Sequence, residues 1–220
     1  MQKAASSTTK RAISLSAGRL SITTAVATLV LLAALHLISP EFDPSWRMVS
    51  EYALGDYGWV LALMFLAWAL SCVALFFAIR SQIRTVRGRI GLGFLLVAAI
   101  GMSMAAVFDV RHDLHGLAAL IGIPSLPIAA MLISVTLVRN QAWSSTRRLL
   151  LWTANLTWIS LVLMNVAVFV GLSQNGGEFG PDVLAGWPNR FLVAAYCAWP
   201  MAVAWCADRL QRQEPWTIRP

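Results

Sequence analysis

The stretch YGWVLALMFLAWALSCVALFFAI occupies residues 57–79 and carries no acidic or basic side chain. A helix that crosses the hydrocarbon core of a bilayer needs roughly 20 mostly apolar residues, so this stretch is long enough to be one transmembrane helix. A transmembrane β-strand would be about half as long and would alternate apolar with polar residues. Residues 57–79 do neither, and they therefore predict a membrane-spanning helix.

Five further stretches are similarly long and apolar and carry no acidic or basic residue in the middle: Leu20–Ser39, Gly88–Phe108, His115–Val138, Leu149–Leu172 and Pro188–Ala207. Only 12% of the chain is charged, about half the share found in a soluble domain, so most of the surface must face lipid. The sequence predicts an all-α, polytopic membrane bundle of six transmembrane helices. We expect a basic N-terminal segment at 1–19, a six-span domain at 20–207 and a C-terminal tail at 208–220.

The charged residues predict which way the bundle faces. With the N-terminus in the cytoplasm, only Arg47, Arg111 and Arg190 of the 17 Lys and Arg residues fall on the outer side. Acidic residues show the opposite bias, since only Asp208 and Glu214 fall on the inner side. Cytoplasmic loops are enriched in Lys and Arg, so we expect both termini to be cytoplasmic in a plasma membrane. The net charge of +7 thus belongs to short loops between spans, which argues against nucleic acid as a partner.

Polar side chains gather at the predicted outer face. They come from the loop after the first span, the link between the third and fourth spans, and the last outer loop. The candidate functional cluster consists of Ser50, Glu51, Asp109, His112, His115 and Arg190. His36 lies three residues before the end of the first span, which is about 5 Å below the membrane boundary at ~1.5 Å per residue.

This cluster has two interpretations. The first is a zinc site with ligands from His36, His112, His115, Asp109 and Asp113. Three protein ligands and an open water position would make a hydrolytic centre. The second is a network in which Arg47, Arg111 and Arg190 pair with Glu51, Asp109 and Asp113. A charge near lipid needs a partner whatever the function, so we favour the network and keep zinc as the alternative cofactor.

Ser50 followed by Glu51 could be read as a nucleophile and a base. No Gly-x-Ser-x-Gly context surrounds Ser50, and such a context exposes the nucleophile in one large class of hydrolases. Serine is also a preferred helix cap, and glycine a preferred helix terminator. We therefore expect a short interfacial helix that Ser50 caps and that ends at Gly55.

Three short motifs resemble those of a known family. They are Ser50-Glu51-Tyr52-Ala53-Leu54-Gly55 followed by Tyr57-Gly58-Trp59, Phe108-Asp109 followed by His115-Gly116, and Gly186-Trp187-Pro188-Asn189-Arg190. Their order and the span count resemble the domain-of-unknown-function 998 family of six-span bacterial and archaeal membrane proteins, over about residues 20–207. Members often carry a second histidine about one turn after the His-Gly pair, where this sequence has alanine. The resemblance implies a fold and the position of a site, but no activity.

Three functions remain open, and the sequence does not decide whether the protein is an enzyme. It favours a non-enzymatic scaffold, sensor or stability factor over a small-molecule or lipid transporter and over a metal-dependent lipid hydrolase. The midplane offers Asn155 and Asn165, which we expect to hydrogen-bond to neighbouring helices, but no charge, and this disfavours proton-coupled transport. Trp68 lies deep in its span, where we expect it to pack between helices. Membrane lipid is the expected partner, with a lipid or small-molecule ligand possible at the outer face; oligomeric state is left open.

Overall fold

The computed structural model describes the backbone of residues 2–213 and the side chains of residues 15–212. Lys3, Lys10, Arg11, Glu214 and Arg219, which entered the orientation argument, therefore lie outside the described side chains. The long helices are α1 (Gln2–Ile38), α2 (Gly58–Ile79), α3 (Val86–Val107), α4 (Leu114–Leu137), α5 (Arg147–Gln174) and α6 (Gly186–Gln213). Two short 3-10 helices, η1 (Val49–Leu54) and η2 (Gln141–Thr146), lie in the connections. The six helices are long and apolar enough to cross a membrane, and they confirm the predicted all-α bundle.

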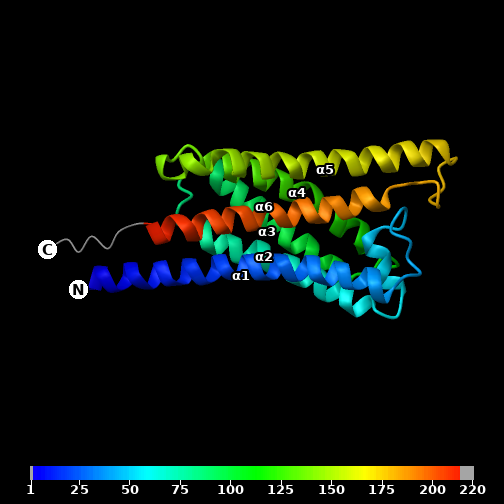
Figure 1. Cartoon of the computed structure of the whole chain (residues 1–220), viewed down its shortest axis with the longest axis horizontal. Coiled ribbons are helices and arrows are strands. Elements are labelled where there is room, and N and C mark those ends of the chain that lie inside the picture. Colours follow the sequence, from blue (N-terminus) through cyan, green and yellow to red (C-terminus); the bar gives the residue numbers. More distant parts are fainter. Residues whose placement is uncertain (1, 214–220) are drawn as a thin grey trace.

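The long helices run side by side along one axis of the molecule (Figure 1), and α6 contacts α2 and α4 as well as α1 and α5. Each packs against the helices before and after it in the chain, and α1 also packs against α6. The first helix begins and the last helix ends at the same end of the bundle, which an even number of spans requires. Among the six spans α6 is the most buried and α5 the least. Side chains on α6 are therefore well placed to contact several other elements.

Helices α3 and α4 approach each other through two glycines. A Cβ atom on Gly101 would lie 2.5 Å from the Cα of Gly122 and 2.8 Å from the carbonyl oxygen of Ala118. Helices in membranes approach closely where small residues line the contact. Gly93, on the same helix α3, has nothing within 4 Å of such a Cβ, so close approach is confined to particular positions.

The side of α5 that points away from the bundle is apolar and exposed, with Val162 at 56%, Val166 at 52% and Phe169 at 74% exposure. Lipid tails are as apolar as these side chains, so exposing them to lipid costs no free energy. The expectation that Asn155 and Asn165 bond to neighbouring helices is wrong. Both are exposed on α5 and donate to their own helix, at 2.9 Å to the Leu151 carbonyl and 2.8 Å to the Leu161 carbonyl respectively. An amide without water satisfies its donor at the nearest carbonyl, which lies one turn back.

Candidate functional site

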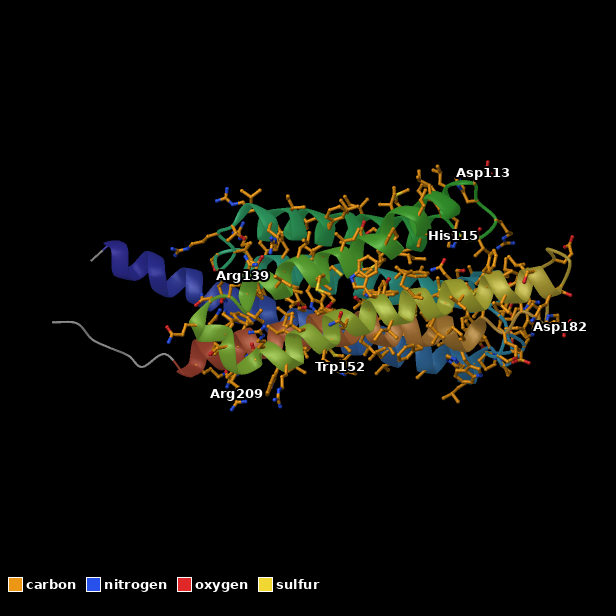
Figure 2. All side chains as sticks on the ribbon, turned by 90° about the horizontal axis from the view of Figure 1, so that it is seen from above. Asp113, His115, Arg139, Trp152, Asp182 and Arg209 are labelled. Carbon is orange, nitrogen blue, oxygen red and sulfur yellow. The ribbon has the colours of Figure 1, made fainter. Side chains whose placement is uncertain are left out.

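The candidate residues lie at the end of the bundle opposite the two termini, here called the distal end. It contains the segment between α1 and α2, the link between α3 and α4, and the segment between α5 and α6. Figure 2 shows Asp113, His115 and Asp182 near this end, with Arg139 and Arg209 near the opposite end. The candidate residues therefore come from segments that share the distal end of the bundle.

Arg190 is the centre of a buried polar latch that joins four elements. Only 5% of the residue is exposed. Its Nε donates to His36 Nε2 at 2.7 Å, and its Nη2 donates to the Tyr52 hydroxyl at 3.0 Å. Its Nη1 donates to the carbonyl oxygens of Arg47 at 2.7 Å and Gly186 at 3.0 Å. The guanidinium fork of α6 thus holds α1, the following segment and η1 in fixed positions.

The hydrogen bonds of the latch define the tautomer of His36. Its Nδ1 lies 2.6 Å from the Leu32 carbonyl oxygen, and a carbonyl only accepts, so Nδ1 carries the proton. Nε2 accepts from Arg190 and must therefore present its lone pair. His36 is neutral in this arrangement, and both of its ring nitrogens are occupied.

No carboxylate lies within ion-pair distance of Arg190 in the described part of the chain. The predicted pairs Arg47–Glu51, at 2.8 Å, and Arg111–Asp109, at 3.3 Å, are confirmed. The prediction that Arg190 completes this set with a carboxylate is wrong. Its charge is held by two carbonyls, a hydroxyl and an imidazole instead. Three of these acceptors come from other elements and the fourth is the carbonyl of Gly186, one turn back in α6. A buried charge needs such compensation to be tolerated.

The short helix predicted before Gly55 is present, but Ser50 does not cap it. Helix η1 begins at Val49 and is preceded by Met48. The Glu51 carboxylate accepts the Met48 backbone N–H at 2.6 Å while it also pairs with Arg47. An acidic residue at the third helical position reaches back to the helix start in this way. Ser50 is already inside the helix, and its hydroxyl is left available for other contacts.

The link between α3 and α4 forms a separate, more exposed group. Asp109 accepts from the Arg111 backbone N–H at 2.8 Å, and this bond is the main reason why the pKa of Asp109 is lowered. His112 Nδ1 accepts from the Leu114 backbone N–H at 3.1 Å, at the start of α4. His115 lies 2.8 Å through Nδ1 from the Phe108 carbonyl, so its Nε2 is the unprotonated nitrogen of the neutral ring.

A similar local bond acts on Asp43 in the segment after α1. The Ser45 backbone N–H donates to its carboxylate at 2.8 Å and is the largest cause of its lowered pKa. The positive charge of Arg190 lowers the same pKa further, to a smaller extent. Asp43 is thus held mainly by its local bond to Ser45, and the Arg190 charge acts on it without an ion pair.

The five candidate zinc ligands do not assemble. Among the described side chains, no three His, Cys, Asp or Glu residues come close enough to hold a metal ion. His36 is committed to the Leu32 carbonyl and Arg190, while Asp109 and His112 are engaged by backbone N–H groups of their own link. A zinc site needs at least three protein ligands, and the structure gives this hypothesis no such set.

A cavity of about 270 Å³ opens beside the latch, between η1, α2, α3, α4 and α6. Ser50, His115 and Asn189 line it near the distal end, and Trp68 and Tyr196 line it deeper in the bundle. Trp68 is ten residues into α2 and Tyr196 ten residues into α6. At ~1.5 Å per residue these two side chains lie roughly 15 Å from the starts of their helices, so the cavity reaches into the interior of the bundle.

The cavity wall is mainly apolar and has no Asp, Glu, Lys or Arg among its described lining residues. Asn189 is held in place, since its Oδ1 accepts from Val49 N at 2.8 Å and its Nδ2 donates to Met164 Sδ at 3.3 Å. The Tyr196 hydroxyl donates to the Ile123 carbonyl at 2.8 Å. The predicted cluster is therefore divided. Ser50 and His115 line the cavity, Arg190 forms the latch, Glu51 pairs with the Arg47 side chain beside it, and Asp109 and His112 lie in the exposed link.

Tyr52, Trp68, Asn189 and Tyr196 were not among the predicted site residues. Tyr52 and Asn189 stand inside the first and third motifs, so the motifs carried a signal for them. Trp68 and Tyr196 stand in uniformly apolar stretches, where nothing in the local sequence separates a cavity wall from ordinary helix packing.

Six spans joined by short links, with a polar latch and cavity at one end, define a multi-pass integral membrane protein. The chain belongs to the family described as "Protein of unknown function (DUF998)", whose model matches residues 22–206. This confirms the family that the three motifs resemble. No curated protein and no solved structure matches the chain.

Proposed function

We propose that this is a non-enzymatic plasma-membrane protein that senses a small, uncharged apolar molecule by binding it at the extracytoplasmic face. The observation that carries the proposal is the cavity of about 270 Å³ at the distal end. Small-molecule sites are concave and mostly apolar, with a few fixed polar groups that orient the ligand. A cavity with these properties favours a ligand-binding sensor over a scaffold that only makes protein contacts.

The latch supports the same function by fixing one wall of the cavity. Arg190 is adjacent in sequence to Asn189, and it bonds to Tyr52 of η1, the helix that supplies Ser50 to the cavity. Interfacial segments without such anchors are generally mobile. A preformed wall lowers the ordering cost of ligand binding.

The size of the cavity limits the ligand. An apolar cavity of about 150 Å³ holds benzene, so by proportion about 270 Å³ holds roughly ten non-hydrogen atoms. That is a small molecule or part of a larger amphiphile. A transporter would need a path onward to the other end of the bundle, and Asn155 and Asn165 cannot line one because they are exposed on α5.

The proposal includes the orientation of the bundle in the membrane. Arginines concentrate at the end of the bundle where α1 begins and α6 ends, including Arg80, Arg84, Arg139 and Arg148. The cytoplasmic enrichment of basic residues supports cytoplasmic termini and an extracytoplasmic distal end. The ligand would then reach the cavity from the outer leaflet or the space beyond it.

The test is methyl NMR of the detergent-solubilised protein with labelled methionines, titrated with α-methylstyrene. Met48 and Met102 line the cavity, and Met201, which does not, is the internal control. We expect saturable shifts at Met48 and Met102 alone. Ala119→Phe, which fills the cavity, should abolish them, whereas Ala194→Phe on the exposed side of α6 should not. Equal shifts at all three methionines, or in both variants, would refute the proposal.

A further inference from the structure

Trp68 is a buried donor without a partner. Only 4% of the residue is exposed, and its indole Nε1 has no hydrogen bond within the described part of the chain. Other buried tryptophans are paired: Trp143 Nε1 donates to Gln82 Oε1 at 2.9 Å, and Trp199 Nε1 donates to Ser134 Oγ at 3.0 Å. Buried polar groups are nearly always paired, so each exception needs an explanation. Trp68 also lines the cavity, so a molecule bound there is a candidate partner for the indole, although Nε1 itself is covered in this structure.

The surroundings of Trp68 leave few other ways to satisfy this donor. Its ring stacks on Phe65, with centroids 6.4 Å apart, and meets the edge of Tyr196 at 6.0 Å. The Tyr196 hydroxyl is already directed to the Ile123 carbonyl at 2.8 Å. The indole N–H therefore lies covered and unpaired in an apolar region roughly 15 Å below the start of α2, at ~1.5 Å per residue. A ligand oxygen in the cavity would reach it after a small movement of the indole or of its neighbours.

Resting on the proposed function, we propose that the ligand is a small neutral carbonyl compound whose oxygen accepts a hydrogen bond from Trp68 Nε1. The absence of Asp, Glu, Lys and Arg from the described cavity wall argues against a charged ligand, because an unpaired charge there would be very costly. The inserted acyl chain of a phospholipid fits less well, because its methyl end would leave the Trp68 donor unpaired. A neutral oxygen at the buried end of the ligand brings no charge into the cavity and gives the Trp68 donor an acceptor.

The experiment compares two probes of nearly equal shape, acetophenone and α-methylstyrene. Acetophenone has a carbonyl oxygen where α-methylstyrene has a CH₂ group. The protein is the full chain with ¹⁵N-labelled indoles, and Trp68→Phe identifies the Trp68 signal. We expect acetophenone to move the Trp68 indole proton downfield in a saturable way, and α-methylstyrene not to do so. A neutral hydrogen bond should make acetophenone bind about 2- to 12-fold more tightly. Trp68→Phe should remove this preference, while Trp152→Phe, on the exposed face of α5, should retain it.

The outcomes separate this inference from the proposed function. If both probes bind with equal affinity, or if the indole proton does not respond, the carbonyl inference is overturned while the binding cavity stands. A Trp68 indole that exchanges with a bound water and ignores acetophenone also overturns it. If neither probe reaches Met48 and Met102, both proposals fail. Should Trp68→Phe not fold, Trp→Phe variants of the other nine tryptophans identify the Trp68 signal by elimination, and its shift in the parent protein decides the question.

Discussion

Gly101→Ala should separate α3 from α4 and destabilise the bundle. The added Cβ would lie 2.5 Å from the Cα of Gly122, where ordinary contact begins at 3.4 Å. The two helices would have to move apart by about 0.9 Å at this point. A gap of that size forfeits a quarter to a half of the dispersion energy between the surfaces that it separates.

The expected magnitude follows from two opposing effects. Overpacking a well-filled contact costs about 1–3 kcal/mol, while replacing glycine by alanine inside a helix gains about 0.5–1 kcal/mol. Gly93→Ala isolates the second effect, because it lies on the same helix and has nothing within 4 Å of the added atom. We expect Gly93→Ala to be stabilising and Gly101→Ala to be net destabilising. The difference between them should be about 1–3 kcal/mol.

The assay is equilibrium unfolding in mixed micelles, with helix content followed as the fraction of denaturing detergent rises. Both variants are measured against the parent chain, and the difference in unfolding free energy between them is the quantity of interest. If the two variants change stability by the same amount, α3 and α4 do not meet through Gly101 and Gly122. That result would refute the packing on which the cavity geometry depends.

Two further predictions concern the latch and the orientation. Arg190→Lys keeps the charge but cannot reproduce a fork that makes four hydrogen bonds, so it should lower the unfolding free energy by about 3 kcal/mol. Tyr52→Phe loses one bond to a charged donor and should lower it by about 1.5 kcal/mol. If Tyr52→Phe were the more destabilising variant, Arg190 would not be the centre of the latch. Asp182→Cys should react with a membrane-impermeant thiol reagent on intact cells, and Arg139→Cys only after permeabilisation. The native Cys72, Cys197 and Cys206 are buried and should not interfere. Reactivity of Arg139→Cys alone on intact cells would invert the proposed orientation.

The local sequence was sufficient to predict where the transmembrane helices lie. Helix α2 begins at Gly58 and ends at Ile79, within one residue of the stretch predicted from apolar length, because each backbone polar group in lipid must be paired within its own helix. The salt bridge between Arg47 and Glu51 was also predictable, since the two residues are only four positions apart in the sequence. The three motifs indicated the family and marked two segments of the site.

The partners of Arg190 and the unpaired donor of Trp68 were decided only by the tertiary structure. The sequence predicted that Arg190 would find a carboxylate, because a charge near lipid needs compensation. The chain instead brings His36, which is 154 residues away, to the guanidinium. Trp68 resembled any other packing residue, since what distinguishes it is the cavity that four helices and η1 enclose beside it. Apolar length is a property of one segment, whereas the pairing of a buried polar atom depends on which distant segments surround it.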